Sequence, residues 1–387
     1  MDSVWRRFGR LSPYHVKQRP RRRRALSSDL VRGWLRVAVY GLAVVAFFEA
    51  SARLALRNDR FFRRVAGEDD ASWRLRWVKR HAKRPGIYFD FDAFSPTRGW
   101  ALRPGIRDLR VFHGSTLNSN SHGLRGRDEF EYAKPPETTR IVVLGDSFTF
   151  GEEVSDDETY SRQLARRLPG VEVLNLGVHG YGHDQMLIYF LEEGLKYHPD
   201  VVLLGFVSDD MERNLLQFRD YAKPRYVLER GRLALRGSPV PTPDVSYDRE
   251  WSRLRFFDLL TMLRERYRLS SGARQQEMRR LTLALLDALR DAIVAAGARP
   301  AFAYLPIFGE VTRTDPGMTE RERFFFSYCR ERGIQSIYLS PFFQKRLREG
   351  ADLSPYGHWR ALEHATAAEG IRAYLLEKGL LPGIASH

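Results

Sequence analysis

The stretch that decides the fold is Arg140-Ile141-Val142-Val143-Leu144-Gly145-Asp146-Ser147-Phe148-Thr149-Phe150-Gly151. Its apolar run, Ile141 to Leu144, is typical of a strand that is buried on both faces of a sheet. Glycine, aspartate and serine follow at once, so we expect the strand to end in a polar turn that leads into a helix. A serine at such a turn exposes its hydroxyl, and its amide has no intrahelical partner. Ser147 is therefore the first candidate for chemistry.

Apolar runs alternate with helical periods from this strand to the C-terminus. Strand–helix alternation of this kind predicts an α/β fold, with a doubly wound, mostly parallel sheet in three layers. An irregular insert at about 218–248 interrupts the pattern. Further strands are predicted at 171–175, 201–207, 301–305 and 337–339, and helices at 158–168, 183–197, 250–268, 276–297, 318–332 and 359–378.

Polar residues follow the predicted strands, where a doubly wound sheet has its active site. Gly177–Gly182 follows the second strand, Ser208–Asp210 follows the third, and His358 precedes the last helix. Each feature alone has an ordinary reading, such as a tight turn or a helix N-cap. Together they supply a hydroxyl, a proton acceptor and free amides, which nucleophilic acyl transfer requires.

From about Arg140 onward the chain resembles the SGNH/GDSL hydrolase family, which implies a three-layer, flavodoxin-like α/β fold. The resemblance makes Ser147 the nucleophile, His358 its base, and the amides of Ser147 and Gly180 the oxyanion donors. The segments that carry it are 140–151, 175–180 and 205–210, with Asn120-Ser121-His122-Gly123-Leu124-Arg125 resembling a lead-in of membrane-anchored bacterial members.

Two positions depart from the family's pattern. Asp209 stands where the family has an asparagine that donates to the oxyanion, and an ionised carboxylate can only accept. Pro355 and Tyr356 stand where an aspartate would orient the histidine. Asp352 is the nearest candidate for that acid. The alternatives are a Ser147–His358 dyad or a backbone carbonyl that orients the ring.

Further side chains are expected around the pocket. Asp146, His179, His183 and Asp210 are its candidate neighbours, and for the two histidines a place on the loop without a role in the pocket is an equal alternative. His364 is an alternative base, although its place in the last predicted helix favours packing. No cofactor is implied. The single cysteine, Cys329, excludes an intramolecular disulfide, and without a cysteine cluster no metal site is predicted.

The net charge of +15 is concentrated near the N-terminus. The densest block, Arg21–Arg24, directly precedes a hydrophobic stretch, which fits the positive-inside rule. A nucleic-acid-binding protein would instead spread basic residues over a folded face. We therefore expect the membrane, and no nucleic acid, as a partner of this region.

The hydrophobic stretch is short for a membrane span. Its uncharged core is Val37 to Phe48, but Arg36 can extend toward the headgroups and Glu49 falls at the far end. We interpret it as an uncleaved anchor with a cytoplasmic N-terminus and an external remainder. The alternatives are a signal peptide, with Glu49-Ala50-Ser51-Ala52 as the nearest cleavage site, and a buried or interfacial helix of a soluble protein.

Three functions follow as hypotheses for a single-pass protein of a bacterial inner membrane. The first is an esterase that removes an O-acyl group, most often acetyl in this family, from a cell-envelope glycan or lipid through an acyl-enzyme. The second is an O-acetyltransferase of exopolysaccharide assembly, and the third is a catalytically impaired binding protein. The predicted divisions are a basic N-terminus (1–32), an anchor helix (33–56), a connector (57–137) and the SGNH hydrolase-like domain (138–387).

Overall fold

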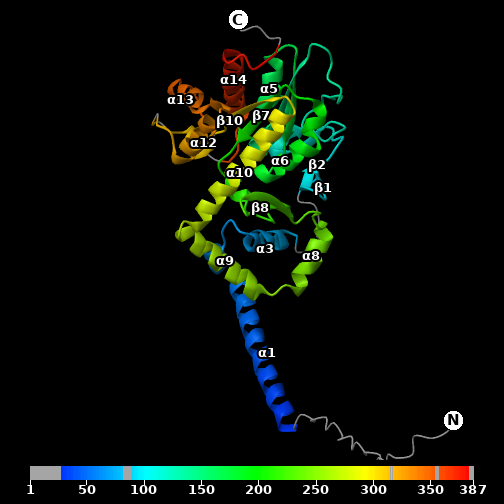
Figure 1. The fold of residues 1–387 in the computed structure, drawn as a ribbon, viewed down its shortest axis with the longest axis vertical. Helices are drawn as coiled ribbons and strands as arrows, with labels where there is room; N and C mark the ends of the chain where they lie inside the picture. Colours follow the sequence, from blue (N-terminus) through cyan, green and yellow to red (C-terminus); the bar gives the residue numbers. More distant parts are fainter. Residues whose placement is uncertain (1–27, 82–88, 314, 316, 354–356, 383–387) are drawn as a thin grey trace, which may run out of the picture.

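The computed structural model describes residues 28–81, 89–313, 315, 317–353 and 357–382 (Figure 1). Its centre is a five-stranded sheet in the order β11-β10-β7-β5-β6, in which all neighbours are parallel. This confirms the predicted α/β fold. The strands are β5 (Thr139–Gly145), β6 (Val171–Gly177), β7 (Val201–Phe206), β10 (Arg299–Tyr304) and β11 (Gln335–Tyr338).

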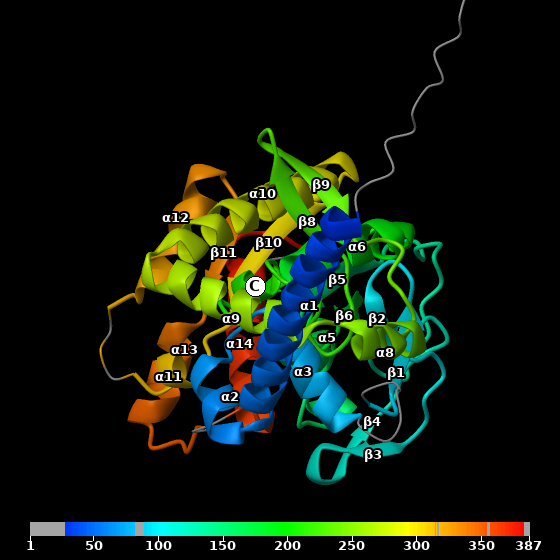
Figure 2. The ribbon, with the colours of Figure 1, turned by 90° about the horizontal axis from the view of Figure 1, so that it is seen from below.

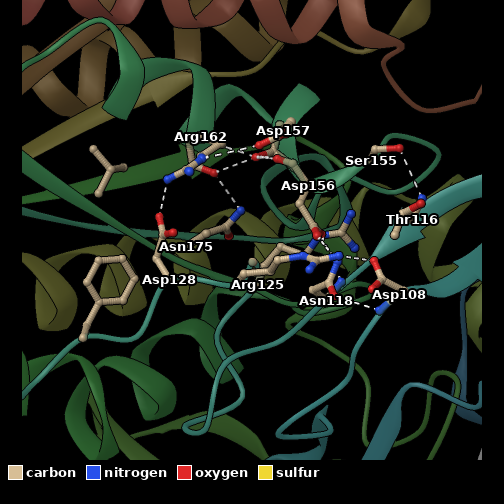
Figure 3. Close-up of a pocket in the computed structure, with 16 residues that line it drawn as sticks. Asp108, Thr116, Asn118, Arg125, Asp128, Ser155, Asp156, Asp157, Arg162 and Asn175 are labelled. Carbon is tan, nitrogen blue, oxygen red and sulfur yellow. Dashed lines mark hydrogen bonds and ion pairs between the residues drawn. The ribbon is translucent and has the colours of Figure 1, made fainter.

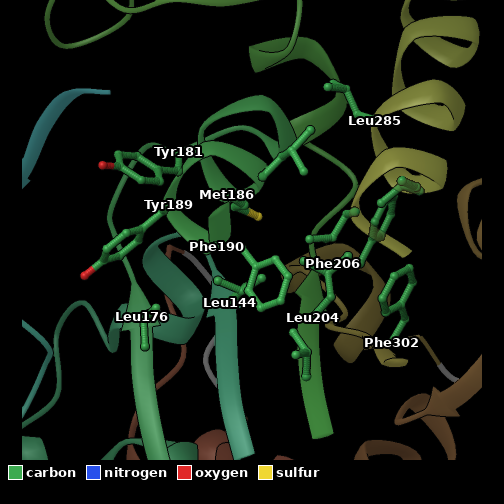
Figure 4. Packing of buried hydrophobic residues seen from close by; sticks show 14 of the residues in the cluster. Leu144, Leu176, Tyr181, Met186, Tyr189, Phe190, Leu204, Phe206, Leu285 and Phe302 are labelled. Atoms are coloured by element: carbon green, nitrogen blue, oxygen red, sulfur yellow. The ribbon is translucent and has the colours of Figure 1, made fainter. Parts of the chain in front are cut away.

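Alternate residues of β5 enter two separate cores, one on each face of the sheet. Val142 and Leu144 pack on one face, and Ile141 and Val143 on the other, because successive side chains of a strand point to opposite sides. Figure 4 shows the first of these cores, where Leu144 lies close to Phe190. The covering helices are α6 (His183–Glu192), α10 (Ala273–Ala295) and α12 (Glu320–Glu331) on that face, and α5 (Tyr160–Arg166), α13 (Ser340–Arg348) and α14 (Ala361–Glu377) on the other.

The order of the strands creates a crevice at their carboxyl ends. β6 pairs with one edge of β5, and β7 pairs with its other edge. The chain therefore reverses its direction across the sheet after β6, and such a switch point is where open α/β sheets bind ligands. The short elements around this end are α4 (Ser147–Phe150), α7 (Asp210–Arg213), α11 (Phe308–Val311) and the 3₁₀ turns η1 (Phe112–Gly114) and η2 (Asp156–Glu158). A third 3₁₀ turn, η3 (Gly194–Tyr197), precedes β7 at the opposite end of the sheet, where the Tyr197 carbonyl accepts a hydrogen bond from Arg140.

The segment predicted as a connector is largely structured and packs against the domain. Trp100, only 1% exposed, enters the core beside Tyr181, with 5.4 Å between ring centroids. Phe91 and Leu102 join a smaller cluster with Phe150, next to the nucleophile turn. The elements are α2 (Asp59–Val65), α3 (Asp70–Arg80) and two antiparallel hairpins, β1 (Asp92–Ser95) with β2 (Gly99–Leu102) and β3 (Leu109–Val111) with β4 (Ser115–Leu117).

The predicted insert forms a hairpin followed by helices. β8 (Arg225–Glu229) and β9 (Arg232–Arg236) make the hairpin, and α8 (Pro243–Ser252) follows. The backbone is extended at Arg253 and Leu254, so the helix predicted from residue 250 is divided, and its second part is α9 (Arg255–Ser270). In Figure 1 these helices and α3 lie between the sheet and α1.

The N-terminal hydrophobic stretch is part of a long helix, α1 (Ser28–Arg57), that projects from the body as a rod (Figure 1) and is seen in front of the body in the view from below (Figure 2). Its segment Arg32–Arg57 is long and apolar enough, by length and composition, to cross a membrane, and 6% of its most apolar window is buried. Trp34, Tyr40 and Phe47 are each about two-thirds exposed or more. The apolar segment of the helix is thus exposed, whereas Leu56 near its end is buried in a cluster with residues of α2, α3 and α9. The basic block Arg21–Arg24 lies outside the described residues.

Candidate active site

Ser147 occupies the first position of α4, directly after the central strand β5. The Asp146 carboxylate caps this short helix and accepts a hydrogen bond from the Phe148 amide at 2.9 Å. Ser147 is 3% exposed, so its hydroxyl faces a confined space instead of bulk water. The predicted strand–turn–helix around the serine is present.

His358 lies beside Ser147, although 211 positions separate them in the chain. Its Nε2 atom is 2.8 Å from Ser147 Oγ, and its ring packs against Phe148 with 5.3 Å between centroids. A neutral imidazole can accept the hydroxyl proton through Nε2. The pair therefore has the geometry of a nucleophile with its general base.

Ser147 and His358 open onto a cavity of ≈ 450 Å³. Its wall combines charged side chains, such as Glu152 and Asp220, with apolar ones, such as Phe89 and Ile307. The lining residues are Phe89, Ser147, Phe148, Glu152, His179, Gly180, Asp209, Arg213, Arg219, Asp220, Ile307, Gly309, Gly357 and His358.

The loop after β6 brings the Gly180 backbone to the same cavity. Gly180 has φ +71°, and a Cβ there would lie 2.9 Å from Asp220 Oδ2, so this position requires glycine. Gly177 permits the end of β6 to approach the nucleophile turn, because a Cβ at this position would lie 2.3 Å from the Phe150 amide nitrogen. Among the described residues, neither the Ser147 amide nor the Gly180 amide has an acceptor. Both donors are available for an oxyanion.

A buried network holds this loop from the side of the β1–β2 hairpin. Trp100 Nε1 donates to the His179 carbonyl at 2.9 Å, and His179 Nε2 lies 2.8 Å from Asp92 Oδ1. Tyr221 Oη donates to the other Asp92 oxygen at 2.8 Å. Burial lowers the pKa of His179, but the Asp92 carboxylate more than offsets this effect, so the pKa is raised. His179 lines the cavity, as predicted, and also anchors the Gly180 loop.

Asp209 stands at the cavity wall in an exposed position. Its side chain is 54% exposed and forms an ion pair with Arg321 at 3.0 Å. The same Arg321 nitrogen donates to Ser208 Oγ at 3.0 Å. Asp209 therefore contributes an acceptor at the position where the family pattern has a donor.

Asp146 and Asp210 lie beneath the cavity instead of lining it. Both are fully buried and share the Arg213 guanidinium, which is 2.9 Å from Asp146 Oδ2 and also pairs with Asp210. Burial raises the pKa of Asp210 well above its ordinary range, and the charge of Asp146 adds to the effect. Arg213 also donates to the Tyr181 carbonyl at 3.1 Å. This cluster connects the nucleophile turn with α7, a role that the prediction of pocket residues did not include.

The predicted acid, Asp352, does not contact the histidine. Its side chain is 85% exposed and lies 3.4 Å from Arg360, whose other nitrogen donates to the Asp352 carbonyl at 2.6 Å. Residues 354–356, which include Pro355 and Tyr356, lie outside the described part of the chain. Among the residues that are described, none accepts a hydrogen bond from His358 Nδ1. The described residues therefore do not distinguish the dyad from a backbone carbonyl that orients the ring.

Glu152 is the carboxylate closest to the histidine, and sequence reasoning missed it. Its Oε2 atom lies 3.6 Å from His358 Nε2, on the same side of the ring as Ser147. The glutamate follows Gly151, where the chain leaves α4 with φ +83° and turns back over the serine. The sequence offered one signal for its role, because Glu152 comes directly after the segment 140–151 that contains the nucleophile.

Two other histidines are core residues. His183, a predicted pocket residue, is 1% exposed, stacks on Phe206 and lies 3.2 Å from Asn214. His364 accepts a hydrogen bond from the Tyr160 amide at 3.2 Å. Burial lowers the pKa of each to about 3, so both are neutral at physiological pH. The placement of His183 corrects the pocket prediction, and the packing role expected for His364 is observed.

A second cavity, of ≈ 340 Å³, lies behind the nucleophile turn (Figure 3). Asn175 separates it from α4 and donates to the Thr149 carbonyl at 2.8 Å. Arg125 lies in its wall, beside Asp156 at 2.9 Å and over the Phe150 ring at 4.8 Å. Neither Ser147 nor His358 lines this cavity. Its residue Asn175 stabilises the nucleophile turn through the hydrogen bond to Thr149.

A parallel α/β sheet with a serine–histidine pair at its switch point defines the class of serine-dependent α/β hydrolases. Residues 143–326 match the model of the GDSL-like Lipase/Acylhydrolase family. Residues 143–326 are therefore similar to this family of acylhydrolases, and the similarity supports carboxylic ester hydrolase activity.

Solved structures with similar folds are distant in sequence. A protein assigned to the G-D-S-L family of lipolytic proteins from Desulfitobacterium hafniense is 14% identical, with a TM-score of 0.36, and the match covers 62% of this chain and 100% of that one. An acetyl xylan esterase variant from Geobacillus stearothermophilus is 14% identical, with a TM-score of 0.37, and the match covers 63% of this chain and 97% of that one. A member of the lipolytic G-D-S-L family from Veillonella parvula is 11% identical, with a TM-score of 0.34, and the match covers 62% of this chain and 97% of that one. No curated protein matches the chain.

Proposed function

We propose that this protein is a serine esterase that removes short O-acyl groups, such as acetyl, from a glycan of the cell envelope. The observation that carries the proposal is the 2.8 Å approach of His358 Nε2 to Ser147 Oγ in a cavity with two unengaged amides. A long acyl chain would need an apolar channel. The cavity wall carries Glu152, Arg213 and Asp220 instead, which favours a polar alcohol over a lipid.

The reaction follows the acyl-enzyme scheme. Ser147 Oγ attacks the ester carbonyl carbon as His358 Nε2 takes the hydroxyl proton, and the amides of Ser147 and Gly180 donate to the resulting oxyanion. The C–O bond to the alcohol then breaks, and His358 returns the proton to the departing oxygen. Water attacks the acyl-serine with His358 again as base, which releases the acid and restores Ser147.

A fluorophosphonate probe tests this chemistry in the full chain. Wild type should form an adduct on the peptide that contains Ser147 and hydrolyse p-nitrophenyl acetate, whereas Ser147→Ala should do neither. Ser270→Ala, which changes an exposed serine at the end of α9 away from the site, is the control. If wild type does not react at Ser147 at any pH tested, the enzyme proposal is wrong and a binding role remains. An adduct without hydrolysis, together with acetyl transfer to a glycan acceptor, would identify the transferase alternative.

We also propose that α1 anchors the domain outside the cytoplasm, in a bacterial inner membrane. The exposed apolar surface of Arg32–Arg57 and the basic block Arg21–Arg24 before it support this orientation. A periplasmic reporter fused after Arg60 should be active. Activity of a cytoplasmic reporter at the same position would contradict the orientation.

A further inference from the structure

The junction of α8 and α9 is fixed to α1 where its uncharged core, Val37 to Phe48, ends. Glu49 follows this core, and its two carboxylate oxygens accept hydrogen bonds from the Arg255 and Phe256 amides, each at 3.0 Å. The rings of Phe48 and Phe256 lie 5.4 Å apart. The start of α9 therefore lies at the same height along α1 as Glu49.

The position of Glu49 along a membrane span follows from helix geometry. A span of about 20 residues at about 1.5 Å per residue crosses a hydrocarbon core of about 30 Å. Counted back from Glu49, such a span reaches Leu30, and the charged pair of Glu49 with Arg53 then lies at its outer edge. A segment held against Glu49 by two hydrogen bonds lies in the headgroup region.

This segment, Trp251–Leu260, is called the α8–α9 bend, and it exposes large apolar side chains. The exposed fractions are 78% for Trp251, 60% for Phe257 and 45% for Leu260. Phe257 and Leu260 are three residues apart on α9 and so share a face. The opposite face packs toward α1, α2 and α3 through Met262, which is 1% exposed.

The charges around the bend are arranged as at a membrane surface. Its acidic groups, Glu250 and Asp258, are buried and paired with arginines, including Arg255. Arg53 and Arg253 in contrast leave 48% and 44% of their side chains exposed. Within Trp251–Leu260 itself no acid is exposed, although Asp248 of α8 is. Exposed aromatic and arginine side chains are typical of interfacial segments, and anionic headgroups attract them.

We propose that the α8–α9 bend is a second membrane contact, which inserts Trp251, Phe257 and Leu260 among the headgroups beside α1. This inference rests on the proposed anchoring by α1. The contact would hold the body against the membrane at a second point, so that the catalytic cavity keeps one orientation relative to the surface.

Depth-dependent quenching in nanodiscs tests the contact with the full chain. Single cysteines at Trp251, at Tyr40 in α1 and at Leu191 on α6 would carry an environment-sensitive dye, since all three sites are exposed. The native Cys329 is buried, which raises its thiol pKa to about 12 and keeps it unreactive. The quenchers are lipids that carry a spin label either at the headgroup or deep in the acyl chain.

The proposal predicts strong quenching at position 251 by headgroup spin labels, at position 40 by deep labels, and at position 191 by neither. The pair Phe257→Glu and Leu260→Glu should abolish most quenching at position 251, whereas Val294→Glu on α10, which is also exposed, should not. Quenching at position 40 without quenching at position 251 overturns the second contact alone. No quenching at position 40 overturns the anchor, and with it this inference. Protection of position 251 that depends on protein concentration and not on lipid identifies a second copy as the occupant, and also overturns it.

Discussion

The Glu152 carboxylate lies 3.6 Å from the Nε2 atom of His358, the nitrogen that takes the proton in the proposed reaction. In the usual triad the acid contacts the other nitrogen of the ring. Here the negative charge faces the proton as it arrives, so Glu152 is placed to stabilise the imidazolium that forms during attack. It acts through His358 and is a positioning residue.

Glu152→Gln should lower kcat for p-nitrophenyl acetate by about 10- to 100-fold, with little change in KM, because only the charged transition state loses an interaction. Glu153→Gln, on an exposed neighbour, should leave kcat unchanged. Steady-state kinetics of both variants provides the measurement. Equal kcat values for Glu152→Gln and wild type would show that the charge of Glu152 does not assist His358.

Asp209→Asn should raise kcat, by about 10-fold, because an amide can donate where the carboxylate can only accept. Arg321→Gln is the informative control, since it breaks the same ion pair at 3.0 Å without adding a donor near the serine. We expect no gain from Arg321→Gln. A loss of activity in Asp209→Asn would show instead that the acid at this position is required.

The His179–Asp92 pair should make stability depend on pH in a defined direction. The pKa of His179 is raised above its ordinary value of 6.5, so the pair stabilises the fold fully below that value and loses its effect as pH rises through the raised pKa. Asp92→Asn should therefore lower the unfolding free energy by about 1.5–3 kcal/mol in acid and by less in base. Urea unfolding from about pH 5 to about pH 9 measures the difference. The exposed Asp90→Asn should show no such trend, and a constant gap for Asp92→Asn would refute the charge pairing.

Lys223 and Asp184 form a fully buried ion pair, with 2.5 Å between Nζ and Oδ2. Lys223→Met should lower the unfolding free energy by about 3–5 kcal/mol, because it leaves the Asp184 carboxylate buried without a cation. Adding Asp184→Asn should recover part of that loss. Chemical denaturation of the single and double variants tests this coupling. Additive losses would mean that the two side chains act independently.

Local sequence patterns were sufficient for the sheet and for the nucleophile. Ile141 to Leu144 of β5 are apolar and buried, and Gly145-Asp146-Ser147 comes next, so strand, turn and hydroxyl could be predicted together. Its partner His358 could be identified only by resemblance, since a contact across 211 positions leaves no periodic signal.

The remaining site residues depend on tertiary packing. His183 is only four residues after His179, but it lies on the first turn of α6, where its ring stacks on Phe206 instead of lining the cavity. Asp352 is near His358 in the chain, yet Arg360 competes for it and holds it at the surface. Glu152 reaches His358 because the chain turns at Gly151, and Trp100 reaches the His179 loop because the β1–β2 hairpin packs there. Neither arrangement can be predicted from the local sequence.

Trp100 donates a hydrogen bond to the His179 carbonyl, so the smallest fragment that keeps the catalytic loop supported includes the β1–β2 hairpin. A fragment that starts at residue 138, where the family resemblance begins, would retain every catalytic residue but lose Trp100, Asp92 and Phe91 from its buried surface. Its oxyanion loop would then face water on one side. Crystallisation or assay of an isolated catalytic unit should begin no later than the β1–β2 hairpin.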